Sequence, residues 1–277
     1  MKDHNQIIFH QTLLGSKDII LIEMIESNEI IGKCVLSIIS KEEAEISDIK
    51  ISDQDNDIDN DQIYSTLFIE VVKIAKVKQL STIYLTVSQN HFTTIGKTSV
   101  LENHLISSNW ILKNHQNIFI FDGQNMNKDH WLLINHLTED FTIDSIQSVT
   151  NQEEEEIERG KNIWYPERFY PFQYNSMGKN SLVMRFKGNI IGWCVTTIAG
   201  SNMLMYDNLF VKKEYWNLGR SISLFGKSLK IQCEESDIKY VTFTVHGDNK
   251  PLLKILHKRT LDYKVDYKEL KVYELAL

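Results

Sequence analysis

The residues best suited to chemistry lie in positions 206–229, which read YDNLFVKKEYWNLGRSISLFGKSL. A strand-like segment is followed by Gly219, which precedes a helix-like segment with an apolar face. Unpaired amides at a helix N-terminus, with aligned peptide dipoles behind them, attract an anion, and glycine permits close backbone approach. Three cationic side chains surround one acidic residue in this loop: Lys212, Lys213, Arg220 and Glu214. The pattern therefore predicts phosphate binding.

This stretch resembles the central motif of the GNAT superfamily of acyltransferases, where a strand ending in Leu-x-Val leads into a glycine-containing loop and a long helix. In that family, backbone amides of the loop hold the pyrophosphate of coenzyme A. The resemblance implies acetyl-CoA or another acyl-CoA as co-substrate, no metal, and these cofactor-binding residues: Leu209, Phe210, Val211, Asn217, Leu218, Gly219, Arg220, Ser221 and Asn249. The sequence departs from the family where Trp216 replaces Arg or Gln, and where Ser221 replaces a second Gly or Ala.

Two residues are candidates for proton transfer, which acyl transfer requires because the attacking amine must be neutral. Asp207 lies four residues before Val211, where many GNAT enzymes carry an acidic base; it equally suits a strand end that caps a backbone amide. His246 ends a later strand, and histidine is the residue type best matched to proton transfer near neutral pH; a polar turn residue is the alternative interpretation. Asn249 matches a family Asn and also suits a helix N-cap.

The resemblance fails at the residue that protonates the thiolate in the family, a Tyr on the helix after the next strand. Leu256 stands in that position, and Thr260 replaces the usual Gly. Either the thiolate needs no acid from the protein, or a nearby group supplies it. His246, His257 and Tyr263 are the neighbours in sequence.

The chain contains an internal repeat. Residues 30–35 read IIGKCV and residues 190–195 read IIGWCV, and aligning Gly32 with Gly192 gives an offset of 160 residues. Each copy then shows a second strand pattern, a helical segment and a third strand pattern, STIYLTVSQN in one and KYVTFTVHGDN in the other. The sequence before IIG is shorter in the first copy, which predicts a truncated start.

The first copy carries an acidic segment where the second has its glycine loop. ISDQDNDIDNDQIYS holds five aspartates and no basic residue, with Asp59 aligned to Gly219. Carboxylates repel phosphates at close range, by about 1–4 kcal/mol per pair depending on exposure. We therefore predict that this copy does not bind coenzyme A. A calcium loop of the EF-hand type is disfavoured because Ile58 and Tyr64 stand where Gly and Glu are needed.

These patterns predict a mixed α+β fold of the α/β type: two GNAT-like domains, each a mostly antiparallel twisted sheet flanked by helices. We place the boundary after the strand NIFIFDG, which gives a truncated, degenerate domain 1–125 without a cofactor loop and an acyltransferase domain 126–277. HWLLINHLTEDF, residues 130–141, is expected to be a helix that opens the second domain. The acidic run QEEEEIER, residues 152–159, is interpreted as a solvated helix face.

Aromatic residues gather before the second IIG, where they either wall an acceptor pocket or belong to the core. They are Trp164, Tyr165, Phe169, Tyr170, Phe172 and Tyr174.

Composition excludes several classes of protein. A net charge of −7 and a pI near 5.7 disfavour a broad nucleic-acid surface. Cys34, Cys194 and Cys233 form no Cys-x-x-Cys pair, which disfavours disulfide and zinc frameworks, and no apolar run reaches membrane-span length. A soluble, cytoplasmic protein without a nucleic-acid or membrane partner is the expectation.

The sequence thus predicts an N-acyltransferase that moves an acetyl or longer acyl group to a primary amine of a small molecule or peptide, by direct attack in a ternary complex. Two alternatives stay open: an enzyme whose donor is an acyl carrier protein, and an inactive pair of GNAT folds that acts as a scaffold. The degenerate copy could complete the acceptor pocket, rigidify the second copy or mediate a homodimer.

Overall fold

A computed structural model describes most of the chain and divides it into two compact units. Unit 1 comprises Met1–Gln116 and Lys268–Leu277, and unit 2 comprises Asn117–Tyr267. The described residues are 8–13, 19–52, 60–90, 97–133, 137–216, 219–260 and 262–277. The acidic residues 53–59, on which the prediction for the first copy rests, and Asn217 and Leu218 of the predicted cofactor loop lie outside them.

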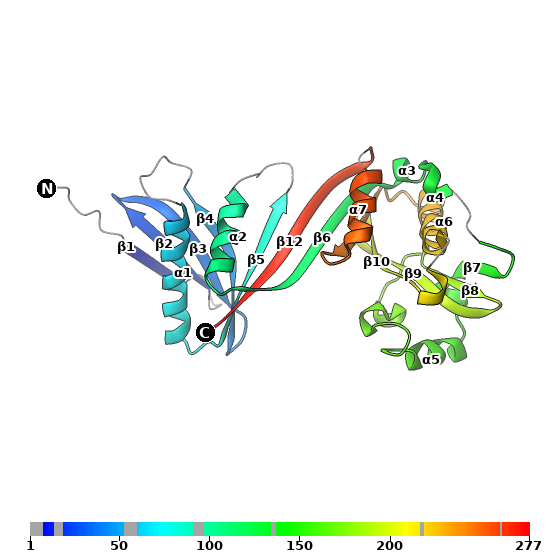
Figure 1. Cartoon of the computed structure of the whole chain (residues 1–277), viewed down its shortest axis with the longest axis horizontal. Helices are drawn as coiled ribbons and strands as arrows, with labels where there is room; N and C mark the ends of the chain where they lie inside the picture. The colour runs from blue at the N-terminus through cyan, green and yellow to red at the C-terminus, as the bar shows by residue number, and fades with distance from the viewer. Residues whose placement is uncertain are drawn as a thin grey trace. The chain divides into compact units, whose positions relative to one another are not determined.

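Unit 1 is a mostly antiparallel sheet covered by two helices, with strand order β1-β2-β3-β4-β5-β12-β6 (Figure 1). Its elements are β1 (Ile8–Leu13), β2 (Ile19–Glu26), β3 (Glu29–Ile38), β4 (Glu43–Ile51), α1 (Asn60–Val77), β5 (Thr82–Asn90), α2 (Lys97–Ser107), the start of β6 (Ile111–Asp122) and most of β12 (Lys264–Ala276). β4 and β5 are parallel over a short stretch, whereas β1 to β4, and β5 with β12, pair antiparallel.

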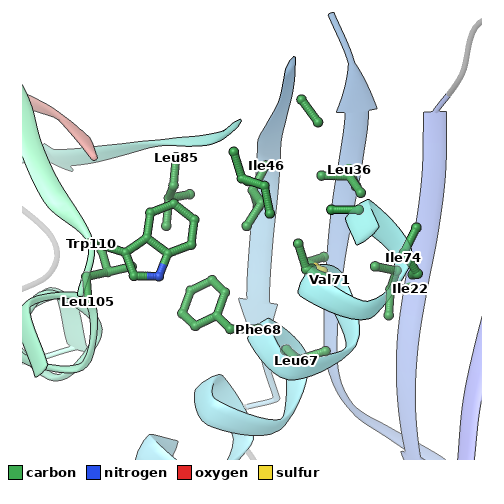
Figure 2. Packing of buried hydrophobic residues seen from close by; sticks show 14 of the residues in the cluster. Ile22, Leu36, Ile46, Leu67, Phe68, Val71, Ile74, Leu85, Leu105 and Trp110 are labelled. Carbon is green, nitrogen blue, oxygen red and sulfur yellow. The ribbon is translucent and has the colours of Figure 1, made fainter. Parts of the chain in front are cut away.

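The core of unit 1 forms because the apolar faces of the strands and of α1 pack against each other. Strand residues such as Ile22 and Leu36 alternate inward with period two, and Leu67, Val71 and Ala75 recur every four residues along α1. Figure 2 shows Ile22, Leu36, Leu67 and Val71 pointing into one cluster, where Leu67 and Val71 are fully buried. Burying side chains of this size stabilises the fold by about 1.5–3 kcal/mol each.

Unit 2 has the strand order β12-β6-β11-β10-β9-β8-β7. Its elements are the end of β6, α3 (Gly123–Met126), α4 (His130–Leu133), β7 (Phe141–Ser145), η1 (Ile146–Ser148), α5 (Asn151–Arg159), η2 (Glu167–Phe169), η3 (Pro171–Gln173), β8 (Leu182–Phe186), β9 (Asn189–Gly200), β10 (Met203–Val211), η4 (Lys213–Tyr215), α6 (Arg220–Glu235), β11 (Tyr240–His246), α7 (Lys250–Arg259) and the start of β12. β7 to β10 pair antiparallel and β10 with β11 parallel. The predicted mixed fold with mostly antiparallel sheets flanked by helices is confirmed.

The two faces of the unit 2 sheet carry separate cores. On one face, Leu224 and Leu229 of α6 and Leu253 and Leu256 of α7 pack against the strands. On the other, Ile157 of α5 and the aromatic segment 164–174 pack against strand residues that include Trp193 and Phe210. α6 and α7 therefore cover one face, and α5 with the aromatic segment covers the other.

Two strands pass between the units. β6 starts in unit 1 and continues into unit 2 from Asn117, and β12 starts in unit 2 and continues into unit 1 from Lys268. Each copy thus places its last strand partly in the sheet of the other copy. A linear division at residue 125 assigns the last ten residues of the chain to unit 2, whereas they lie in unit 1 beside β5.

The internal repeat is visible in the strand irregularities. A register shift between residues 24 and 25 of β2 skips Ile31 of β3, and one between residues 184 and 185 of β8 skips Ile191 of β9. β4 skips Ser47 and β10 skips Asp207 in the same way. Both pairs keep the offset of 160 residues. Gly192 of the IIG motif is required because a Cβ there would lie 2.5 Å from the Phe210 carbonyl oxygen.

The start of the second copy differs from the sequence prediction at one helix. In the expected helix 130–141, α4 covers His130–Leu133, residues 134–136 lie outside the described part, and Phe141 begins β7. Phe141 packs against Phe186 of the neighbouring strand, so sheet packing overrides the apolar pattern that indicated a helix. Between the first two strands, the first copy has five residues, whereas the second has α5 and three 3-10 helices.

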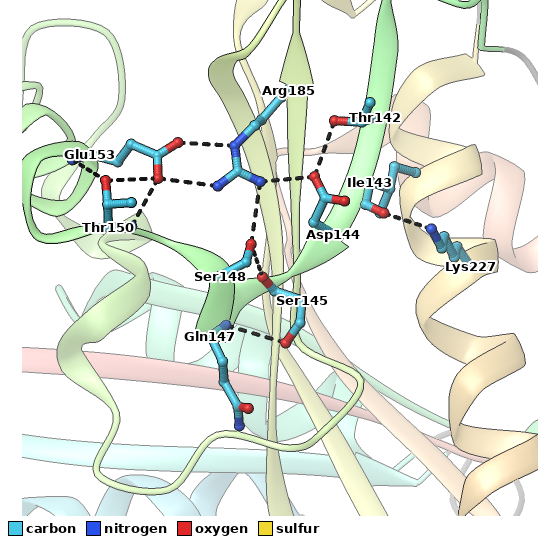
Figure 3. Close-up of polar contacts among 10 residues, drawn as sticks. All are labelled: Thr142, Ile143, Asp144, Ser145, Gln147, Ser148, Thr150, Glu153, Arg185 and Lys227. Atoms are coloured by element: carbon cyan, nitrogen blue, oxygen red, sulfur yellow. Dashed lines mark hydrogen bonds and ion pairs between the residues drawn. The ribbon is translucent and has the colours of Figure 1, made fainter.

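The acidic run forms α5, a solvated helix as predicted, but Glu153 has a structural role. Thr150 and Glu153 form a capping box at the start of α5. Glu153 also accepts hydrogen bonds from Arg185 of β8, whose Nη1 donates to Asp144 of β7 at 2.9 Å (Figure 3). The Arg185 guanidinium thus ties α5 to two strands.

This network predicts a pH-dependent stability. The hydrogen bond from Arg185 lowers the pKa of Glu153, so its stabilising effect is present above the ordinary pKa of Glu and is lost as pH falls through the lowered value. We expect Glu153→Gln, which can keep the cap, to lower the melting temperature at pH 7 and to reduce its fall between pH 5 and pH 3.

The matched control is Glu155→Gln, because Glu155 is exposed on the same helix. Equal acid sensitivity of wild type and Glu153→Gln would contradict the assignment.

Candidate active site

The candidate site lies where β10 and β11 separate. The two strands pair in parallel over residues 203–205 and 240–242. Past these residues the described pairing stops, while β10 continues to Val211 paired with β9, and β11 continues to His246. Backbone groups on the facing edges of the two strands are thereby left available to an extended ligand.

The helix after β10 begins at the predicted glycine. Gly219 is the N-cap of α6 and has a φ of 70°, in the left-handed region that glycine adopts without strain. Glycine has no side chain that could accept a hydrogen bond from the first-turn amides of α6. A ligand can therefore accept from these N–H groups, which lie at the positive end of the helix dipole. The geometry fits an anion at this position.

Two of the three cationic side chains of the loop, Lys212 and Arg220, lie on aromatic rings. The Arg220 guanidinium lies 4.5 Å from the Phe141 ring centroid, and Lys212 Nζ lies 4.0 Å from that of Trp164. The indole N–H of Trp216, at the family's Arg or Gln position, donates to the Val211 carbonyl. These side chains brace the loop, so an anion here would rely chiefly on backbone amides.

Of the three predicted strand residues, Leu209 is the most open. Its side chain is 40% exposed, whereas Phe210 and Val211 are buried in the cores on opposite faces of the sheet. Leu209 could contact a ligand through its side chain, and Phe210 and Val211 through their backbone.

Asp207 lies at the β-bulge in β10. The Thr197 hydroxyl donates to Asp207 Oδ2 at 2.6 Å, across from β9. Burial raises the pKa of Asp207, and the Thr197 hydrogen bond opposes that shift in part. A half-buried carboxylate with a raised pKa is suited to accept a proton, and bulges are frequent next to active sites.

Sequence reasoning missed two polar residues on the same face of the sheet, Thr197 and Asn208, and the contact of Asn208 with Tyr174. Asn208 is buried, and its Nδ2 donates to the Tyr174 hydroxyl at 3.3 Å and to the Tyr170 carbonyl at 3.5 Å. Thr197, Asn208 and Tyr174 are up to 34 residues apart in the chain. Two adjacent polar residues, Asp207 and Asn208, inside an apolar strand were the available signal for a bulge.

The structure places His246 and Asn249 at the other strand. His246 is exposed at the end of β11, and its Nδ1 lies 2.8 Å from Asp248 Oδ1. Asn249 is the N-cap of α7 and accepts from the Leu252 amide at 3.3 Å. The cap interpretation of Asn249 is confirmed; a role for either residue with a ligand stays a prediction.

The residues near the missing Tyr are packed into the fold. Leu256 is 3% exposed in the core beneath α7. The Tyr263 hydroxyl donates to Asp129 Oδ2 at 3.0 Å, and His257 lies edge-on to the rings of Phe119 and Tyr267. These contacts give Tyr263 and His257 structural roles.

Most of the aromatic segment belongs to the core. Tyr165 is 2% exposed and donates to the Ile157 carbonyl, and Trp164, Phe169 and Tyr170 are partly buried in the same cluster. Tyr174 differs because its hydroxyl reaches Asn208. The segment therefore fills the core and also presents one phenol to the site.

The cysteines do not suit nucleophilic catalysis. Burial raises the pKa of Cys34 and Cys194 to about 12 and that of Cys233 to about 11, so the thiols are protonated at neutral pH. Within the described part of the chain, no cluster of three His, Cys, Asp or Glu residues could hold a metal, and no helix is long and apolar enough to cross a membrane.

A cavity of about 840 Å³ lies elsewhere, between α6 and residues 127–143. None of the predicted site residues lines it. The candidate site between β10 and β11 is separate from this cavity, because none of Thr197, Asp207, Asn208 and Tyr174 lines the cavity.

Comparison with solved structures identifies the fold as that of tandem GNAT proteins. A tandem GNAT protein from the clavulanic acid biosynthesis pathway is similar at a TM-score of 0.53 and 10% identity, over 93% of this chain and 82% of that one. A GCN5-related N-acetyltransferase from Kribbella flavida gives 0.50 and 11%, over 97% and 90%. A GCN5-related glucosamine N-acetyltransferase region of a fungal β-N-acetylglucosaminidase gives 0.51 and 12%, over 95% and 34%.

No family model matches the sequence, and neither does any curated protein. The resemblance to GNAT acetyltransferases drawn from the glycine loop is confirmed at the level of the fold.

The raised pKa of Asp207 predicts a stability cost at neutral pH. A carboxyl whose folded pKa is raised binds more protons in the folded state, so stability falls as pH rises from the unfolded pKa through the folded one. We expect Asp207→Asn, whose oxygen can still accept from Thr197, to gain stability relative to wild type between pH 4 and pH 7. Melting temperatures across this range test it; a constant difference between the two proteins would contradict it.

Proposed function

We propose that this protein is an N-acyltransferase that moves an acyl group from acyl-CoA to a primary amine. The observation that carries the proposal is the half-buried Asp207 at a β-bulge, beside the separation of β10 and β11 and on the strand that leads to the glycine-capped α6. This combination offers a base, an open backbone edge and an anion site along one path. The similar N-acetyltransferase structures support it.

The chain's own groups have distinct roles in this reaction. Amides at the start of α6 would hold the pyrophosphate of the co-substrate, and the open edge of β10 would bind its extended arm. The Asp207 carboxylate accepts a proton from the acceptor ammonium, and the Thr197 hydroxyl orients that carboxylate. The neutral amine then attacks the thioester carbonyl directly, without a cysteinyl intermediate.

Binding of acetyl-CoA is the first test, measured by titration calorimetry. Gly219→Val should weaken binding about 10- to 100-fold, because a branched residue disfavours the left-handed cap and disturbs charge-assisted hydrogen bonds worth about 1.5–3 kcal/mol. Gly188→Val is the matched control: Gly188 also has a positive φ, in the turn between β8 and β9, with open space around it.

We expect wild type and Gly188→Val to give a heat of binding with acetyl-CoA, and Gly219→Val to lose it. No binding of acetyl-CoA by wild type would remove the acyl-CoA proposal and favour a carrier-protein donor or a scaffold. A loss in both variants would assign the effect to general destabilisation.

Acyl transfer itself is tested at Asp207. Asp207→Asn should leave acetyl-CoA binding within about twofold and lower kcat by about 10²- to 10⁴-fold, the usual contribution of a general base. The assay measures free thiol released from acetyl-CoA in the presence of spermidine, glucosamine or a lysine-containing peptide. His246→Ala, measured in parallel, reports whether the exposed imidazole contributes; wild-type activity in Asp207→Asn would contradict the role of the carboxylate.

A further inference from the structure

The Tyr174 hydroxyl is held in a defined position beside Asp207. It accepts one hydrogen bond from Asn208 Nδ2 at 3.3 Å and another from Gln173 Nε2 at 3.2 Å. Asn208 follows Asp207 directly in β10, and the Asp207 charge acts on the phenol. Two donors from two elements therefore fix the oxygen of Tyr174 at the edge of the candidate site.

These contacts leave the hydroxyl hydrogen of Tyr174 to donate. Both of these bonds are donated to its oxygen, and within the part of the chain that the structure describes, no hydrogen bond donated by the Tyr174 hydroxyl is seen. A phenol that accepts twice still has one O–H to give. Burial raises the pKa of Tyr174 above its usual value, so the hydrogen is present throughout the neutral range.

The side-chain amide of Asn208, which positions the Tyr174 hydroxyl, is buried among mainly apolar side chains. Asn208 is 1% exposed on a strand face packed mainly with aromatic and aliphatic side chains. Burying an amide there is costly unless its groups are paired, and its pairing is directed to the segment that carries Tyr174. Asn208 therefore orients the Tyr174 phenol, although an apolar residue at position 208 would pack better.

We propose that Tyr174 donates a hydrogen bond to the negative charge that develops on the thioester as the amine attacks. This inference rests on the proposed acyltransferase function. It would give the site a donor on the α5 face of the sheet, while Leu256 occupies the α7 position where the family carries its Tyr.

The donor role keeps the proton on Tyr174. The ammonium first gives a proton to the Asp207 carboxylate. A nitrogen–carbon bond then forms and the carbon–sulfur bond breaks, with its electron pair going to sulfur, and the second proton that the nitrogen loses as the amide forms goes to water. A thiol has a pKa of about 8.5, below that of the phenol, so transfer of the phenolic proton to the thiolate is uphill. The thiolate leaves as such and takes its proton from water, and Tyr174 acts through its hydrogen bond.

The test compares Tyr174→Phe with Tyr170→Phe. The Tyr170 hydroxyl bonds to Glu158 of α5, so the control removes the same atom from the same segment and keeps the Tyr170 backbone carbonyl that accepts from Asn208. Thiol release from acetyl-CoA with spermidine, glucosamine or a lysine-containing peptide should show kcat lowered about 10²- to 10³-fold in Tyr174→Phe. KM for the amine, acetyl-CoA binding and the pH profile should stay unchanged, and Tyr170→Phe should retain wild-type kcat.

A second variant checks the positioning. Asn208→Leu keeps the side chain's branching and number of heavy atoms and removes one of the two donors to Tyr174, so kcat should fall by less than in Tyr174→Phe, with acetyl-CoA affinity retained.

The outcomes separate the inference from the proposed function. Wild-type kcat in Tyr174→Phe overturns the inference alone, and so does a raised KM for the amine with unchanged kcat, which would make Tyr174 an acceptor-binding group. A pH profile that loses a basic limb in Tyr174→Phe would also overturn it, since that would show proton transfer. Wild type that neither binds acetyl-CoA nor releases thiol overturns the proposed function and this inference together.

Discussion

The short parallel pairing between β10 and β11 is the constraint on which the site depends. Pairing stops at Met205, and at the next residue a buried network takes over: the Tyr206 hydroxyl donates to Gln232 of α6 at 3.0 Å and accepts from Asn180 at 3.1 Å. This network fixes α6 against β10 at the point where the strands part. Asp207 follows directly at the bulge, so the proposed base, the open strand edge and the helix N-terminus are held by one connected set of contacts.

The first copy keeps this architecture with different chemistry. Its β4 also pairs with β5 over a short parallel stretch, and its bulge falls at Ser47, the counterpart of Asp207. Ser37, the counterpart of Thr197, lies 3.3 Å from Ser47 through their hydroxyls. A hydroxyl pair thus replaces the hydroxyl–carboxylate pair. The bulge is thus retained in the first copy without a carboxylate, so the backbone irregularity does not depend on the side chain at that position.

The sequence could identify features that depend on local pattern. The two IIG segments revealed the repeat, Gly219 marked the helix N-cap, and Asp207 was found by its distance from Val211. Thr197, Asn208 and the contact of Asn208 with Tyr174 were not predicted, because these contacts depend on a register shift that puts two adjacent strand residues on the same face. The sequence also did not predict that β6 and β12 pass between the units. Alternation of apolar and polar residues indicates that a segment is a strand, but it does not identify the neighbouring strand. The helix predicted for residues 130–141 does not include Phe141, because this residue begins β7 and packs against Phe186.

The path of β12 links the two copies during synthesis. In unit 1, residues 268–276 lie against β5 over its whole length, yet the ribosome makes them after every other element of the fold. Until they arrive, the edge of β5 lacks this partner and is open to pairing with other chains. The N-terminal copy, although translated first, therefore cannot complete its sheet before the C-terminal copy has emerged. Both copies should acquire their final stability late and together.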